Sequence, residues 1–200
     1  MSENLNTKVI TPEFKASYVN AWEPGETPNG DLKYSVSMVF SKDTDLSEMK
    51  KAAENAAIKK WGNDKSKWPK KLRKTFRDGD EERPQDSVYQ NSIFVNASSK
   101  QKPGIVDEDV KPLHDQSEFY SGVIARASIN FYAYDRAGNA GVAVGLNNLM
   151  KVRDGERLGG AAKAEDDFSD FKNASSGESA DDSNHSSSHE TVTVSEEDLF

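Results

Sequence analysis

The sequence contains no cysteine among its 200 residues, which excludes disulfide bonds and metal sites built from thiolates. It also lacks any run of about 18 apolar residues, the length that a membrane-spanning helix requires. The polar residues 1–8 have no apolar stretch of the kind found in signal peptides. These absences predict a soluble protein of a reducing cytoplasm, without a membrane segment.

Motifs of catalysis are missing as well. The sequence has no Walker loop, no dinucleotide-binding fingerprint and no nucleophile elbow. Acids at 78, 80, 81, 82 and 86 could offer oxygen ligands to a divalent cation, but they lack the twelve-residue spacing of a calcium loop. His185 and His189 have metal-like spacing inside a Ser-rich stretch, where a spacer is the simpler interpretation. We therefore expect neither an enzyme nor a bound metal or cofactor.

Acidic charge is concentrated at the C-terminal end of the chain. Residues 161–200 hold eleven acids and two bases, a net charge of −9, whereas residues 1–160 carry +1. The acidic stretch is also rich in Ser, Gly and Asn, a composition that does not support a packed core. We predict two regions: a folded domain over residues 1–160 and a disordered acidic tail over residues 161–200.

The tail ends in two apolar side chains after three acids. An acidic segment with an apolar end suits a basic pocket on another protein, whereas a purely solubilising appendage has no need of an exposed Leu-Phe. We therefore predict that partner proteins bind the terminal residues Glu196, Glu197, Asp198, Leu199 and Phe200.

Most of residues 1–160 carry the period of β-strands. We expect a strand over residues 7–19, in which Pro12 favours an edge position or a bulge. Residues 22–30 are expected to form a loop. Residues 32–41 alternate, with Val36, Met38 and Phe40 on one side. Further strands are predicted at 92–97, 119–134 and 141–150, the last two joined by a turn at 135–139.

A helical period replaces this pattern between residues 46 and 61. Thr44 or Asp45 can cap the start of the helix, and Gly62 suits its end. One helix, about five strands and Gly-rich turns predict a mainly β fold, a small antiparallel barrel. A two-sheet sandwich has the same periodicity and stays open as the alternative.

Residues 50–77 form a basic insert in which eleven bases face two acids, for a net charge of +9. Trp61, Trp68 and Phe76 are interleaved with these charges. Phosphates pair with cations and unpaired bases stack on flat rings, so the insert suits single-stranded nucleic acid. The alternative is a solvated helix whose lysine stems cover an apolar stripe. The outer side of the strand at 119–134, with Arg126 and Tyr132, is a second candidate surface.

Several stretches resemble a known family. They are Asn-Ala-Ser-Ser-Lys at 96–100, Pro-Gly-Ile-Val-Asp at 103–107, Tyr-Ser-Gly at 120–122, Asn-Phe-Tyr-Ala-Tyr-Asp at 130–135, Gly-Leu-Asn-Asn at 145–148 and Arg-Asp-Gly-Glu at 153–156. Together they resemble the phage-encoded OB-fold single-stranded-DNA-binding protein family. The resemblance implies an OB-fold that binds single strands without sequence preference in the host bacterial cytoplasm. The expected helix follows the second strand, whereas the usual OB-fold helix lies between the third and fourth, so no residue map is carried over.

The resemblance also implies that the acidic tail recruits replication and recombination proteins. Charge and position select the residues that we expect to contact DNA: Lys33, Arg73, Lys74, Arg77, Lys100, Lys102, Arg126, Tyr132, Lys151 and Arg153. Trp22, Trp61 or Trp68 would provide further rings on which bases stack. Edge strands leave a homodimer open. The competing hypothesis is an adaptor or inhibitor whose acidic tail mimics DNA and binds basic host proteins, which the near-neutral charge of residues 1–160 favours.

Overall fold

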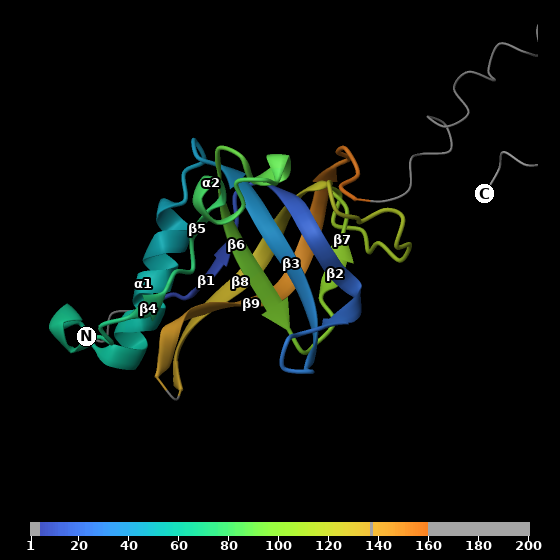
Figure 1. The fold of residues 1–200 in the computed structure, drawn as a ribbon. Coiled ribbons are helices and arrows are strands. Elements are labelled where there is room, and N and C mark those ends of the chain that lie inside the picture. Colours follow the sequence, from blue (N-terminus) through green and yellow to red (C-terminus); the bar gives the residue numbers. More distant parts are fainter. Residues whose placement is uncertain (1–4, 137, 160–200) are drawn as a thin grey trace, which may run out of the picture. The chain divides into compact units, whose positions relative to one another are not determined.

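The computed structural model describes residues 5–136 and 138–159. In this part of the chain, long strands curve around a common core and α1 lies beside them (Figure 1). The predicted acidic tail, residues 161–200, lies outside the described residues, and so does its terminal Leu-Phe. The tail and its partner site therefore stay predictions.

Nine strands of the described residues form one sheet, which confirms a mainly β fold. Five strands are long: β2 (Phe14–Glu26), β3 (Leu32–Ser41), β6 (Ser92–Ser99), β8 (Ile124–Arg136) and β9 (Asn139–Arg153). Four are short: β1 (Lys8–Ile10), β4 (Leu72–Arg73), β5 (Arg77–Asp78) and β7 (Gly104–Val106). Two α-helices, α1 (Ser47–Trp61) and α2 (Gly79–Glu82), and two 3₁₀ turns, Lys65–Lys67 and Ser87–Tyr89, complete the elements.

The five long strands pair in a closed circuit. β2 pairs with β3, β3 with β6, β6 with β9, β9 with β8, and β8 again with β2. β6 and β9 run parallel, in register at Ser98 and Gly145, whereas the other four pairings are antiparallel. The prediction of a wholly antiparallel sheet was wrong, because the β8–β9 hairpin brings β9 back beside β6 in the same direction.

The core follows the predicted alternation. On β8, Ala125, Ala127, Ile129 and Phe131 are at most 2% exposed, and the intervening side chains lie on the other side of the strand. The strand begins at Ile124 rather than at residue 119. The chain turns at Gly122 (φ +119), where a Cβ would lie 1.8 Å from a backbone oxygen of residue 156, so only glycine fits.

α1 ends as predicted, but Leu46 rather than Thr44 or Asp45 takes the N-cap position; the helix buries its apolar face in the core. Met49 belongs to the main core cluster. The Asp45 carboxylate accepts a hydrogen bond from the Ser47 N–H at 2.9 Å, which satisfies a donor of the first turn. At the other end, Gly62 adopts φ +83 and its N–H donates to the Ile58 carbonyl at 2.8 Å. The predicted helix is confirmed.

The loop expected at residues 22–30 was wrong in its first half, because β2 continues through Pro24 to Glu26. The strand tolerates proline there since its register with β3 shifts between Asn20 and Gly25, where a ladder N–H is not needed. The actual turn is short and ends at Gly30, with φ +80. The single strand predicted over residues 7–19 was wrong, because the chain is interrupted around Pro12, between β1 and β2.

Candidate nucleic-acid interface

The strands of the circuit carry a row of small polar residues on the side away from the core. The register places Asn130 opposite Gly145, Gly145 opposite Ser98, Ser98 opposite Ser35, and Ser35 opposite Asn20. The Asn20 side-chain amide donates to the Ser35 hydroxyl at 3.2 Å. Because directly paired residues point to the same side of a sheet, these five residues define one outer face.

Glycines of β9 make part of this face a groove. A Cβ at Gly141 would lie 3.0 Å from the Tyr134 hydroxyl, and a Cβ at Gly145 would lie 3.8 Å from the Tyr132 ring. A cavity of about 290 Å³ opens here, and its lining includes Arg73, Lys74, Arg77, Asn96, Ser98 and Tyr134. The structure thus brings three predicted phosphate contacts to the edge of a polar groove.

The basic insert reaches this groove because its second half is attached to the sheet. β4 pairs in parallel with β9, placing Arg73 beside Gly141. The Thr75 hydroxyl donates to the Val142 carbonyl at 2.6 Å. Phe76 stacks on the buried Phe131 ring at a centroid distance of 6.1 Å. The position of these cations is therefore set by β pairing and by an aromatic anchor.

Three further predicted cations lie near the start of β3 and the end of β6. Lys33 pairs with Gly25 of β2, and the pairing of Tyr34 with Ser99 brings Lys100, the next residue, to the same end. The Lys102 ammonium lies 5.6 Å from the Trp22 ring. Within the described residues, the structure gives none of these three lysines an ion pair with a carboxylate.

The aromatic residues that were expected to stack on bases differ in availability. Trp61 and Trp68 pack against each other at 5.9 Å, and the Trp68 ring N–H donates to the Gly62 carbonyl at 2.8 Å. Trp22 is partly buried, and its ring N–H donates to the Phe119 carbonyl at 2.9 Å. Tyr132, by contrast, is 47% exposed on the outer side of β8.

Two of the predicted cations meet one carboxylate. Arg153 and Arg126 contact the two oxygens of Glu13 at 2.6 and 3.3 Å. The Arg153 hydrogen bond, and then that of Arg126, hold the pKa of Glu13 below its ordinary value. Glu13 therefore stays ionised at neutral pH and occupies both guanidinium groups.

Lys151 also has a carboxylate partner, near the end of β9. Its ammonium lies 2.8 Å from Asp154 Oδ1, and only 18% of its side chain is exposed. The Tyr120 hydroxyl donates to the same carboxylate oxygen at 2.8 Å. These two hydrogen bonds, that of Lys151 first, lower the pKa of Asp154. Lys151 thus does not line the groove, and its ammonium group is held by the carboxylate of Asp154.

Residues 78–91 form a cap that covers part of β3 and β6 on the outer side. Tyr89 is fully buried, packs on Phe94 at 5.0 Å and donates its hydroxyl to Ser37 at 3.1 Å. Gly79 allows the close approach, since a Cβ there would lie 2.0 Å from the Tyr89 carbonyl oxygen. The cap therefore limits the open part of the outer face to the row described above and the groove beside it.

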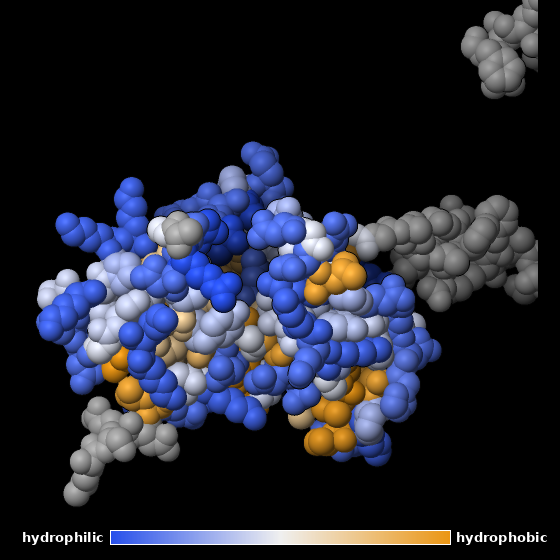
Figure 2. Space-filling model, turned by 90° about the horizontal axis from the view of Figure 1, so that it is seen from below, coloured by the Kyte–Doolittle hydropathy of each residue, from blue (hydrophilic) through white to orange (hydrophobic). Residues whose placement is uncertain are grey.

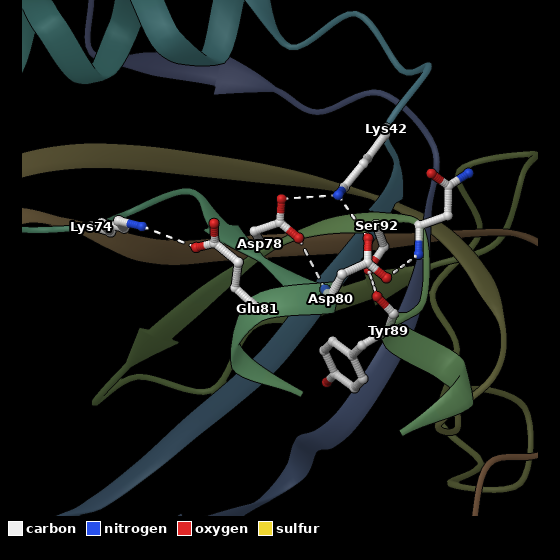
Figure 3. A network of polar contacts seen from close by, with 8 residues as sticks. Lys42, Lys74, Asp78, Asp80, Glu81, Tyr89 and Ser92 are labelled. Atoms are coloured by element: carbon white, nitrogen blue, oxygen red, sulfur yellow. Dashed lines mark hydrogen bonds and ion pairs between the residues drawn. The ribbon is translucent and has the colours of Figure 1, made fainter. Parts of the chain in front are cut away.

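The acids of the cap are bound to cations. In Figure 3, Lys42 bridges Asp78 and Asp80 at 2.9 and 2.7 Å, and Lys74 reaches Glu81 at 3.3 Å. Glu82 pairs with Arg77, whose Nε donates at 2.7 Å. Within residues 5–136 and 138–159, no three His, Cys, Asp or Glu side chains converge as metal ligands. These acids therefore neutralise lysine and arginine side chains.

The helices and the surface of the described residues were compared with those of membrane segments. None of the helices there is long and apolar enough to cross a bilayer. On the face drawn in Figure 2, hydrophilic residues prevail and hydrophobic residues form separate patches.

The match to a family model decides the family. The model describes the single-stranded-DNA-binding protein of Enterobacter phage Enc34 and matches residues 7–182. The chain belongs to this family. The chain is also similar to a protein designated p50 from Acyrthosiphon pisum secondary endosymbiont phage 1. That protein is 30% identical over 178 residues, which cover 84% of this chain and 95% of the relative.

Solved structures of phage proteins share the fold. The Enc34 single-stranded-DNA-binding protein in complex with single-stranded DNA superposes with a TM-score of 0.65 at 20% identity, covering 76% of this chain and 90% of that chain. A single-stranded-DNA-binding protein encoded by bacteriophage T7 gives a TM-score of 0.53 at 16% identity, covering 87% and 98%. The structural similarity thus covers at least 76% of this chain and at least 90% of each of the two solved chains.

The site residues predicted from the sequence leave out several residues of the outer face and the groove. Asn20, Ser35, Asn96 and Ser98 belong to the outer face, and Tyr134 lines the groove. The polar positions alternate with buried ones along β3 and β6, a signal that was present in the sequence. What local alternation does not contain is the register that aligns the strands.

Proposed function

We propose that the protein binds single-stranded DNA without sequence preference along the outer face. The observation that carries this proposal is the polar groove on β9, which is lined by cations of the basic insert and flanked by the exposed Tyr132. Membership of the Enc34 family supports it, because the protein that names the family binds single-stranded DNA.

The chemistry of the groove accounts for binding without base readout. Cations such as Arg73 and Lys100 pair with phosphates wherever the strand carries them, and a base of any type stacks on Tyr132. The small residues of the outer face let the sugar-phosphate chain approach the sheet closely. The acidic groups nearby are already paired with protein cations, which lowers their repulsion of phosphates.

We further propose that the five long strands form an OB barrel. The circuit β2–β3–β6–β9–β8 and its one parallel pair support this assignment. The unusual feature is that α1 follows the second strand of the circuit. The buried face of α1 packs against the core cluster. The helix can therefore close the barrel, although it comes earlier in the sequence than the usual OB-fold helix between the third and fourth strands.

A role in phage replication and recombination follows as a proposal of the same kind. The domain, residues 1–160, would protect single strands, and the acidic tail would recruit replication proteins through Leu199 and Phe200. Phe200→Ala should then retain full DNA affinity and lose co-precipitation with a host or phage replication protein. Equal recovery of partners by both proteins would contradict the role of the tail.

The binding proposal is tested with the full-length protein and a fluorescent oligo-dT, compared with a duplex of the same length. We expect tighter binding of the single strand, quenching of tryptophan fluorescence, and a log-log salt slope of about −0.7 for each phosphate neutralised. A protein that gives no salt-dependent binding of the single strand would overturn the proposal.

A further inference from the structure

Tyr18 has a backbone conformation that bulky residues rarely adopt. Its φ is +46, in the left-handed region that disfavours an aromatic side chain. Ser17 pairs with Ser37 and Asn20 with Ser35, so β2 has one residue more than β3 between these pairs. Such a bulge re-aims a side chain. Here it produces a tyrosine that is 57% exposed.

The exposed ring is nevertheless held in place. The Arg83 guanidinium lies 4.8 Å from the Tyr18 ring and 4.6 Å from the buried Tyr89 ring. It also lies 3.9 Å from Asp86. Arg83 therefore ties Tyr18 to the cap on one side and leaves more than half of the side chain accessible. A fixed ring loses little freedom when a second ring stacks on it.

There is room for such a ring. A cavity of about 280 Å³ adjoins Tyr18, and its lining includes Ser17, Val88 and Ser121. Hydroxyl groups and an apolar side chain together suit the edge and the face of a nucleobase. Backbone strain, an exposed ring and an adjoining cavity thus coincide at one position.

Tyr18 also lies on the opposite side of the outer face from Tyr132. On one side, Ser17 pairs with Ser37, and Ser37 pairs with Asn96 of β6. On the other side, Tyr132 pairs with Ala143 of β9, and Gly145, two residues further along β9, pairs with Ser98 of β6. Tyr18 and Tyr132 therefore flank the same region of the sheet, on β2 and β8. β2 and β8 pair directly where the circuit closes, but the path across the outer face over β3, β6 and β9 has four interstrand spacings of about 4.8 Å. A site of about 4–16 nucleotides covers that path.

We infer that Tyr18 is a second stacking site, which takes one unpaired nucleobase of the strand whose other end stacks on Tyr132. This inference rests on the proposed function. It explains why the chain keeps an aromatic residue in the left-handed region, where glycine or asparagine would fit with less strain.

The test compares Tyr18→Asn with Tyr18→Phe in the full-length protein. Asparagine tolerates a positive φ and removes the ring, whereas phenylalanine keeps it. With an oligo-dT carrying 2-aminopurine, we expect about tenfold weaker binding and reduced quenching for Tyr18→Asn, from the usual loss per stacked base. Tyr18→Phe should bind within about twofold of the parent. Equal affinity and quenching in all three proteins would overturn the inference while leaving DNA binding intact.

Two observations keep the outcomes separable. A parent protein that does not bind the oligonucleotide contradicts the proposed function itself. If Tyr18→Asn fails to fold, photo-cross-linking of the parent protein to DNA that carries 5-iodouracil replaces the comparison. A cross-linked peptide that contains Tyr18 would support the inference. Cross-links found only in other peptides would overturn it.

Discussion

The ten residues predicted to contact DNA divide into two sets of five that differ in what they already bind. The tied set forms ion pairs with carboxylates and consists of Lys74, Arg77, Arg126, Lys151 and Arg153. The open set has no ion pair with a carboxylate within the described residues and consists of Lys33, Arg73, Lys100, Lys102 and Tyr132. Both sets look equivalent in the sequence, but a tied cation must give up a protein partner before it binds a phosphate.

From this difference we expect that the availability of a cation, rather than the number of cations, decides which residues bind DNA. A phosphate that replaces a carboxylate exchanges one anion for another, so the net gain is small. A phosphate that meets an open lysine gains the full contact and releases a counterion. The open set should therefore dominate both the affinity and the salt dependence.

The largest effect is expected from neutralising the four open cations together, with Lys33, Arg73, Lys100 and Lys102 replaced by Gln. Affinity for oligo-dT should fall about 100-fold at about 50 mM salt, because four phosphate contacts are lost. The log-log salt slope should become shallower by about 2.8, at about 0.7 for each contact. Fluorescence anisotropy over a salt series measures both quantities.

The matched control removes the same charge from the tied set, with Lys74, Arg126, Lys151 and Arg153 replaced by Gln. We expect a loss of less than about tenfold and a smaller change in slope. If the control loses as much affinity as the open-set variant, the division into two sets has no functional meaning.

Aromatic residues provide a second contrast, between the exposed Tyr132 and the paired Trp68. Tyr132→Ala should weaken binding of oligo-dT about tenfold, because one stacked base is lost. Trp68→Ala should leave affinity within about twofold, since its ring already packs on Trp61. Titrations of both variants, with thermal melting as a check of folding, measure the contrast. The reverse order of effects would place the stacking site on the insert.

The sequence predicted local structure well and long-range partners poorly, for a physical reason. Alternation along β8 and the stop at Gly62 depend on neighbouring residues, so both were predicted. The parallel pairing of β6 with β9 joins Ser98 to Gly145, and no local period contains it. The same holds for the site, since Glu13 is more than a hundred residues from Arg126 and Arg153.

A smaller effect, opposite in sign, is expected from releasing two tied arginines with Glu13→Gln. Arg126 and Arg153 would lose their shared carboxylate and become available to phosphates. Affinity should rise about threefold at low salt, and the slope should steepen by about 1. Glu23→Gln removes the same charge from an exposed position of β2. An equal rise in that variant would show that net charge alone is responsible.

The smallest effect on DNA binding is expected in the cap, where the ion pairs serve the fold. Hydrogen bonds from Lys42 lower the pKa values of Asp78 and Asp80 below the ordinary 3.8. A carboxyl group whose pKa is lowered by folding stabilises the folded state above its ordinary pKa, and this stabilisation is lost as the pH falls through the lowered value. Asp80→Asn should therefore lower the melting temperature at neutral pH, and its difference from the parent should shrink below about pH 4.

Oligo-dT affinity at neutral pH should stay within about twofold in the same variant, because Lys42 keeps Asp78 as a partner and stays tied. Melting curves from about pH 3 to pH 7 and one titration are sufficient to measure this. A difference in melting temperature that persists unchanged at the acidic end would show that the ionised pair does not stabilise the cap. A large gain of affinity without a change in stability would show instead that the Lys42 ammonium group, once released from Asp80, binds DNA.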